Sequence, residues 1–100
     1  MKFAFMTYSC PDLGFDETLA TALRYGYDGI EPRLNSHHAH GIEFEIDAAT
    51  RRTLREKARQ AGVEICCLAT SCRFADPAKA AEAIDAAHRA IDLAGDLGVP

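Results

Sequence analysis

The sequence lacks the features of a membrane or nucleic-acid-binding protein. It has no apolar run of the roughly 20 residues that a membrane-spanning helix needs. Its formal net charge is −4, so it has no overall attraction to nucleic acid or to an anionic membrane. The first residues carry one lysine and a short apolar run, without the cleavage site of a signal peptide. We therefore expect no nucleic-acid partner and no membrane partner.

Cysteine is present, but not in a pattern that binds zinc or forms a disulfide framework. Cys10, Cys66, Cys67 and Cys72 lie in a chain without secretory features, and their spacing is not a zinc signature. Reduced thiols in a cytoplasmic protein are the expected state. We expect Cys67 and Cys72 to be small buried residues.

Three glycines recur at a fixed interval. Gly26, Gly62 and Gly98 are 36 residues apart, with an alanine four residues before each and an apolar or aromatic residue directly after it. This pattern is typical of a helix that ends on a left-handed glycine. The period indicates a repeated unit of a helix followed by a strand, and the third copy is cut after Val99 and Pro100.

Apolar patterning between these glycines predicts three strands and three helices. The predicted strands cover residues 2–8, 27–32 and 63–70, and the predicted helices cover about 17–25, 48–61 and 77–97. Asp16, Asp47 and Asp76 are the expected helix N-caps, and Pro77 suits a first helical position. We expect strand 63–70 to be covered on both faces, because it is nearly continuously apolar.

Each predicted helix has an apolar face directed at the core. The expected inner residues are Leu19, Ala22 and Leu23 in the first helix, Leu54, Ala58 and Ala61 in the second, and Ala80, Ile84, Ala87, Ile91 and Ala94 in the third.

Strands that alternate with helices imply a parallel sheet with right-handed crossovers. An open doubly wound sheet is disfavoured, because the first strand-to-helix turn has only Gly14 in place of a glycine-rich phosphate-binding sequence. Equal repeats favour a (β/α)8 barrel, which typically needs about 250 residues. We therefore expect residues 1–100 to be the N-terminal part of an incomplete TIM barrel domain.

The active site of such a barrel lies at the carboxyl ends of the strands. Three segments are therefore candidates: residues 8–10, 31–41 and 70–73. The second holds His37, His38 and His40 in a long connection without periodicity. An extended backbone would place His38 and His40 on one side, and imidazoles can act as acid, base or metal ligand. The alternative is a solvated loop in which the histidines have no role.

Glu31 and Arg33 share one face of the second strand, opposite to Ile30 and Pro32. If the apolar pair faces the helices, the charged pair points into the barrel mouth, where burial is costly unless the charges are paired or used. The alternative to a functional role is an internal pair of Glu31 with Arg33, or a pair with Arg73, that only orders the mouth.

Three phrases resemble the sugar phosphate isomerase/epimerase family of xylose-isomerase-like barrels. They are Gly26-Tyr27-Asp28-Gly29-Ile30-Glu31-Pro32-Arg33, His38-Ala39-His40-Gly41 and Thr70-Ser71-Cys72-Arg73-Phe74, and the resemblance covers essentially the whole chain. It implies a TIM barrel that binds one divalent ion (Mn, Mg or Zn) and moves a proton next to a carbonyl through an enediolate. The substrates of such enzymes are sugars or sugar phosphates, and an activity like that of inosose dehydratases, which are lyases, is also within the family.

The resemblance also suggests roles for individual residues. Glu31 and His40 are the candidate catalytic residues, and Arg33, His38 and Arg73 are candidates for substrate binding. No residue matches the family's metal ligands, which we expect beyond residue 100. Arginines suit an anionic group because a guanidinium offers a planar fork of donors. A small carbohydrate is the expected partner, and dimers or tetramers are common among barrels of this kind.

Two alternatives to a sugar isomerase remain at this point. An abasic-site endonuclease of the same superfamily would need a basic barrel mouth, and the acidic balance of the chain speaks against it. A non-catalytic barrel fragment would pair or aggregate through its exposed sheet edges.

Overall fold

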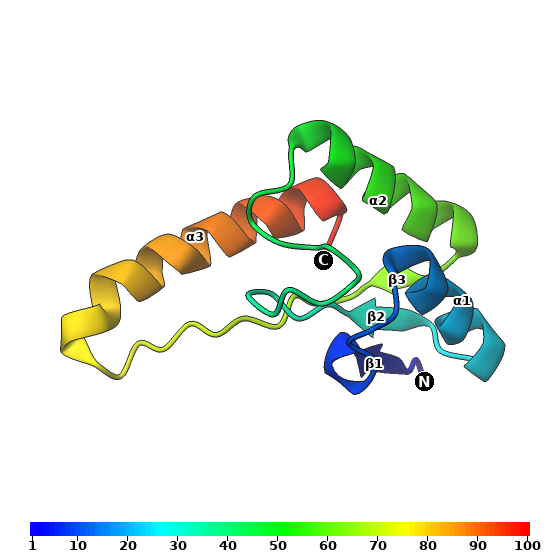
Figure 1. Ribbon diagram of the computed structural model, residues 1–100, viewed down its shortest axis with the longest axis horizontal. Helices are drawn as coiled ribbons and strands as arrows, with labels where there is room; N and C mark the ends of the chain where they lie inside the picture. The colour runs from blue at the N-terminus through cyan, green and yellow to red at the C-terminus, as the bar shows by residue number, and fades with distance from the viewer.

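The computed structural model describes residues 1–100 as a three-stranded parallel sheet with three helices on one face (Figure 1). The strands lie side by side in chain order: β1 (Ala4–Met6), β2 (Gly29–Glu31) and β3 (Glu64–Ile65). The helices are α1 (Phe15–Tyr25), α2 (Ala48–Ala61) and α3 (Ala80–Leu97), with 3-10 turns η1 (Thr7–Ser9) and η2 (Pro77–Lys79). The expected α/β class and the parallel strand order are confirmed.

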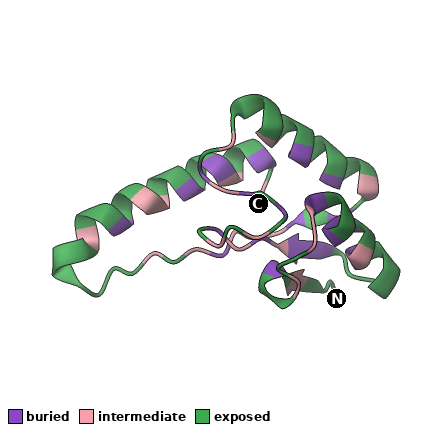
Figure 2. Ribbon diagram, in the orientation of Figure 1, coloured by how far each residue is buried: buried purple, intermediate pink, exposed green.

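The register of the strands places one apolar row under the helices. Phe5 pairs with Ile30, and Ile30 pairs with Ile65. Ile30 and Ile65 are buried with the inner residues of all three helices, and each stabilises the fold by about 1.5–3 kcal/mol relative to an exposed side chain. On the opposite face Met6 and Glu64 are exposed, so the sheet is covered on one side only (Figure 2).

All three glycines of the repeat end a helix in the left-handed conformation, as predicted. Gly26, Gly62 and Gly98 have φ of 75°, 71° and 75°. After each of them the next N–H donates to the carbonyl of the alanine five residues earlier, for example from Tyr27 to Ala22 at 2.8 Å. This hydrogen bond turns the chain back toward the sheet.

The helix starts agree with the prediction at α2 and differ at α1. Asp47 caps α2 by accepting a hydrogen bond from Thr50 N–H at 2.7 Å. The expected cap Asp16 lies inside the first turn of α1, where it pairs with Lys57 at 2.9 Å. Gly14 is the N-cap residue of α1, and burial of Phe15 starts the helix two residues earlier than predicted.

The buried face of α1 contains two of its three predicted inner residues. Leu19 and Ala22 face the core together with Phe15 and Thr18, whereas Leu23 is 56% exposed, so its prediction as an inner residue is wrong. In α2 the prediction is better: Leu54 and Ala58 are buried and Ala61 is half-buried.

The strands are shorter than the predicted ranges because the chain leaves the sheet at each carboxyl end. After β1 the backbone turns into η1. After β3, Cys66 N–H donates to the carbonyl of Ile30, and Ala69 N–H donates to that of Pro32. Between these two hydrogen bonds the chain advances three residues after β3 but only two residues at the end of β2. One extra residue on one of two paired segments is the geometry of a β-bulge. The region 63–70 is therefore a two-residue strand followed by a bulge, and it is not covered on both faces.

Helix α3 buries a different face from the predicted one. Its buried residues are Ala83, Ala90, Leu93 and Leu97, whereas Ile84 and Ile91 are 50% and 66% exposed. The reason is that α3 packs against α2, and this contact selects the row that contains Leu93 and Leu97 (Figure 1). The predicted cap Asp76 precedes η2 and accepts from Ala78 N–H at 3.0 Å.

No helix of this structure combines the length and the apolar character that a membrane crossing requires.

Candidate functional site

Three connections gather at the carboxyl edge of the sheet. They are η1 after β1, the loop 32–47 after β2, and the segment 66–76 after β3. They are tied to one another by hydrogen bonds from Ala39 N–H to the carbonyl of Pro11 and from Leu34 N–H to the carbonyl of Ala69, both 2.9 Å long. The three candidate segments of the sequence therefore lie together at one edge.

The face assignment of Glu31 and Arg33 agrees with the prediction. Ile30 and Pro32 are fully buried under the helices, and the two charged side chains, on the alternate positions, are half-buried. No ion pair joins Glu31 to Arg33 or to Arg73, so the expected alternative of an internal pair is wrong.

Arg33 uses its donors to hold the end of β2 against the segment after β3. Its guanidinium donates to the carbonyl of Thr70 at 2.8 Å and to the Oγ of Ser71 at 2.6 Å. Its backbone N–H donates to the Oγ1 of the fully buried Thr7, at 3.0 Å. A guanidinium has five N–H donors, so those not used here remain available to a ligand. Arg33 thus connects all three strand ends.

The loop after β2 is organised around one carboxylate. Glu43 accepts hydrogen bonds from the backbone N–H groups of Asn35, Ser36 and His37, at 2.7, 3.1 and 2.9 Å. Burial of Glu43 opposes its ionisation, but these three donors outweigh burial and lower its pKa below the usual value. Asn35 and His37 have φ of 56° and 52°, a left-handed conformation that the carboxylate holds in place.

His40 is buried in this loop, which contradicts the alternative of a solvated loop. It is 4% exposed, and its Nδ1 accepts a hydrogen bond from Ile42 N–H at 3.0 Å. Nδ1 therefore carries no proton, and the neutral ring must carry it on Nε2. Nε2 is buried and has no hydrogen-bond partner. The carbonyl of Arg33 interacts with the ring but does not complete a hydrogen bond of ordinary geometry, so this buried donor is only weakly satisfied.

The surroundings of His40 keep its ring neutral. Burial lowers its pKa, the neighbouring His38 lowers it further, and Glu43 and the carbonyl of Arg33 act in the opposite direction without reversing the shift. His40 is therefore a neutral N–H donor at neutral pH.

His38 lies between His40 and the exposed surface. Its ring centroid is 5.7 Å from that of His40 and 5.8 Å from that of Tyr8. The two histidines are neighbours, as predicted, but through a turn closed by Gly41 N–H and the carbonyl of His38 and not through extended backbone. The Nδ1 of His38 is also buried without a partner. His37, by contrast, is exposed.

Three of the four cysteines lie where ionisation is disfavoured. All four are free, and burial raises the pKa of Cys10, Cys66 and Cys67, with the charge of Glu31 adding to the shift at Cys67. Cys10, Cys66 and Cys67 therefore remain protonated thiols at neutral pH. Cys67 is exposed and Cys72 is half-buried, so the expectation of two buried cysteines is wrong.

The side chains present do not form a complete metal site. No group of three or more His, Cys, Asp or Glu residues is arranged to hold a metal ion. A divalent ion bound at this edge would need ligands in addition to His38, His40 and Glu31, so these residues alone do not fit one.

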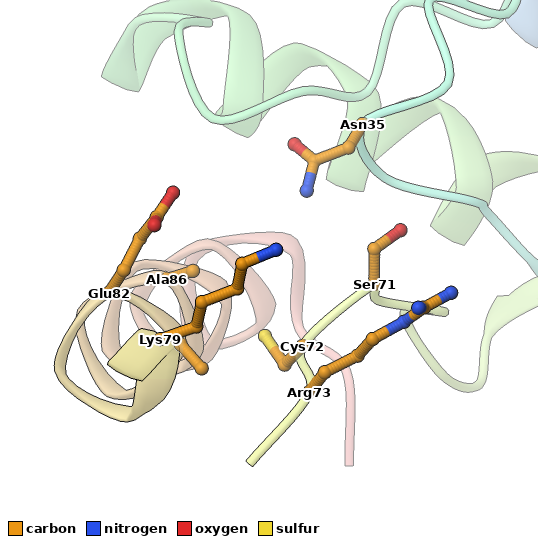
Figure 3. Close-up of a pocket in the computed structure, with 8 residues that line it drawn as sticks. Asn35, Ser71, Cys72, Arg73, Lys79, Glu82 and Ala86 are labelled. Atoms are coloured by element: carbon orange, nitrogen blue, oxygen red, sulfur yellow. The ribbon is translucent and has the colours of Figure 1, made fainter. Parts of the chain in front are cut away.

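Arg73 follows β3 and forms no ion pair. It contributes to the lining of a cavity between the segment after β3 and the start of α3, and its guanidinium turns out of this cavity (Figure 3). Ser71 lies beside it, and Asn35 approaches from the loop after β2.

Sequence reasoning missed Glu43, Thr7, Ser71 and Asn35. A carboxylate that binds three backbone N–H groups leaves no motif, because its partners can be any residues. Ser71 and Asn35 lie in the candidate segments 70–73 and 31–41. Their position after a strand is therefore the one sequence feature that could have indicated them.

Comparison with known proteins agrees with this arrangement. No curated protein matches the chain. The family model for the xylose isomerase-like TIM barrel matches residues 19–100, which include β2, β3, all of α2 and α3 and most of α1. The chain therefore belongs to the xylose isomerase-like TIM barrel family.

Proposed function

We propose that this protein is an isomerase or epimerase of sugars or sugar phosphates, which moves a proton next to a carbonyl. The observation that carries the proposal is the place of these residues in a sheet of this family: Glu31 is the last residue of β2, and His38 and His40 lie together in the loop that follows it. This edge is where enzymes of the TIM barrel fold perform their chemistry.

Glu31 is the group that we assign to proton transfer. Its carboxylate is half-buried on the sheet face that the helices leave open, and no ion pair occupies it. A carboxylate free of cations can take a proton from the carbon next to a carbonyl and return it to the neighbouring carbon. Glu31 supplies one such group. A reaction in which the proton leaves one face of the substrate and returns to the other needs a second proton-transfer group.

The histidines supply hydrogen bonds to the oxygens on which negative charge develops. His38 is closer to the surface and is assigned to contact the substrate. His40 packs edge-to-face against His38 and carries its proton on the buried Nε2, which we assign as a donor to a substrate oxygen. A neutral donor prepared in a buried site stabilises such charge without reorganisation.

A divalent ion (Mn²⁺, Mg²⁺ or Zn²⁺) also belongs to the proposal. Such an ion polarises carbonyl and hydroxyl oxygens when it is bound. Its ligands would have to come from outside the residues described, so no step is assigned to it.

An assay of the intact protein with a panel of ketoses, aldoses and their phosphates tests the proposal. Each substrate is incubated with each of the three metal ions, and epimers and isomers are separated by chromatography. Conversion of at least one substrate, with loss of turnover in Glu31→Gln, is the expected result. Absence of conversion across the panel contradicts the proposal.

A further inference from the structure

The cavity at the start of α3 has the properties of an anion-binding subsite. It has a volume of about 410 Å³ and is lined by eight residues. They come from three places: Asn35 from the loop after β2; Ser71, Cys72 and Arg73 from the segment after β3; and Lys79, Glu82, Ala83 and Ala86 from η2 and α3. Three separate segments thus form its wall (Figure 3).

The charged residues that line this cavity are exposed and form no ion pair. The structure contains four ion pairs, and none involves Lys79, Arg73 or Glu82. Lys79 and Glu82 are three residues apart on the same stretch of helix, yet they do not pair. The Lys79 side chain instead extends toward the space between Asn35 and Ser71 (Figure 3). An unpaired ammonium directed into a polar cavity is available to a ligand.

The hydroxyl of Ser71 is prepared as a donor. Its Oγ accepts a hydrogen bond from the Arg33 guanidinium at 2.6 Å, which leaves its own hydrogen free to point at a ligand. The bond also brings the positive charge of Arg33 next to the cavity. A hydroxyl polarised by a cation is a stronger donor to an anion.

Asn35 is held in place by its backbone. Its φ of 56° is a left-handed conformation, and its N–H donates to Glu43 at 2.7 Å. Its side-chain amide is turned toward the cavity and forms no hydrogen bond within the protein (Figure 3). The loop after β2 therefore fixes the backbone of Asn35 in advance of binding, and only its exposed side chain must be ordered by a ligand.

We infer that this cavity binds the oxyanion of a small polyol, a phosphate or a carboxylate, through Lys79, Ser71 and Asn35. Glu82, on the opposite wall, accepts hydrogen bonds from hydroxyl groups of the same ligand. This inference deepens the proposed function, since it makes the substrate an anionic sugar, and for that meaning it rests on the proposed function. The binding itself does not depend on any turnover.

A titration of the ¹⁵N-labelled intact protein, followed by NMR, tests the inference. Three probes are added separately: inorganic phosphate, gluconate, and glucitol, the neutral polyol that differs from gluconate only at its first carbon. Phosphate or gluconate should shift the Asn35 side-chain amide and the Ser71 and Lys79 backbone signals, with a dissociation constant on the order of 1 mM, as for a weak charged contact. Glucitol should not shift them.

Three variants distinguish binding in this cavity from a nonspecific effect of the protein's charge on the anion. Lys79→Gln should weaken binding at least about ten-fold, the effect of losing one charge-assisted hydrogen bond. Asn35→Gly keeps the left-handed backbone and removes the amide, and it should weaken binding about three- to ten-fold. Arg52→Gln removes an equal charge from the exposed face of α2 and should leave binding unchanged.

Each result has one meaning. A response to phosphate alone assigns the cavity to phosphorylated sugars, and a response to gluconate alone assigns it to sugar acids. No response to either anion, an equal response to glucitol, or unchanged binding in Lys79→Gln overturns the inference, even if the protein proves to be an isomerase. Anion binding without isomerase activity upholds the inference and contradicts the proposed function.

Discussion

The guanidinium of Arg33 lies 2.6 Å from the Oγ of Ser71, so a residue just after β2 fixes the segment that follows β3. The same guanidinium donates to the carbonyl of Thr70. The candidate site and the cavity at α3 are therefore coupled through one side chain. Predictions about Arg33 and its neighbours test how the edge of the sheet is held together.

Arg33→Lys should lower the free energy of unfolding by about 1–2 kcal/mol, because an ammonium cannot reproduce the two-pronged contact with Thr70 and Ser71. Urea unfolding followed by circular dichroism measures the change. Arg52→Lys is the matched control, since Arg52 lies on the exposed face of α2 and should tolerate the change. Equal stability of wild type and Arg33→Lys would show that the contact contributes nothing.

Glu43→Gln should destabilise the loop after β2, at a cost of about 1–3 kcal/mol for weakening hydrogen bonds to a charged acceptor. The folded protein lowers the pKa of Glu43 from its usual value of 4.5. Its contribution is therefore fully present above 4.5 and is lost as the pH falls through the lower folded value. Unfolding measured across this acidic range should show a smaller pH dependence in Glu43→Gln. An unchanged pH profile would contradict the role given to this carboxylate.

His40 should titrate below its usual value of 6.5, because burial disfavours the imidazolium. The unfolded chain then binds more protons than the folded one just below 6.5. The contribution of neutral His40 to stability is complete above this pH and declines as the pH falls toward the folded value. A ¹H–¹⁵N NMR titration of the ring should give this shift and show the proton on Nε2. A proton on Nδ1 at neutral pH would be incompatible with the hydrogen bond from Ile42.

The role of Nε2 can be separated from that of Nδ1 by two substitutions. In His40→Asn the side-chain oxygen can still accept from Ile42 N–H, but no group replaces the Nε2–H donor. In His40→Gln the longer amide reaches closer to the position of Nε2. We expect both variants, and His40→Ala, to remain folded, and turnover in His40→Asn to fall about 10²-fold, as for the loss of a donor to a developing oxyanion. Equal turnover in wild type and His40→Asn would return His40 to a purely structural role.

Gly26→Ala should cost about 1 kcal/mol, because its φ of 75° strains any residue with a Cβ. No atom lies within 4 Å of the Cβ that would be added there, so the cost is purely conformational. Gly95→Ala is the control, since Gly95 lies inside α3 without a positive φ and has open space around the added Cβ, so this change should not destabilise the protein. Thermal unfolding should separate the two variants, and equal destabilisation would contradict the explanation.

The sequence predicted those features of the fold that depend on local geometry. A glycine with positive φ and a small residue in the preceding turn are visible in the chain, so Gly26, Gly62 and Gly98 located the helix ends within one residue. The alternation of Ile30 with Glu31 likewise predicted which side of β2 is buried. The exposure of Leu23 in α1 and of Ile91 in α3 was not predicted, because both are apolar and only the packing of neighbouring helices decides which apolar row is covered.

The sequence predicted where the candidate residues lie, but not the hydrogen bonds that they form. The rule that strand ends carry the chemistry located Glu31, Arg33 and the histidines. The hydrogen bonds that determine their chemistry join residues far apart in the chain, such as Arg33 with Ser71, or involve backbone groups, such as Ile42 N–H with His40. Neither kind of hydrogen bond can be predicted from residue types or from their spacing in the sequence.

Incorporation of solvent deuterium tests the proposed chemistry most directly. The intact protein is incubated in D₂O with ketose phosphates and a divalent ion, and NMR measures deuterium at the carbon next to the carbonyl. We predict exchange at that carbon, slowed strongly in Glu31→Gln and retained in Arg52→Gln. A protein that converts a substrate with no deuterium entering that position, or one whose exchange is as fast in Glu31→Gln, would contradict proton transfer by Glu31 at this edge of the sheet.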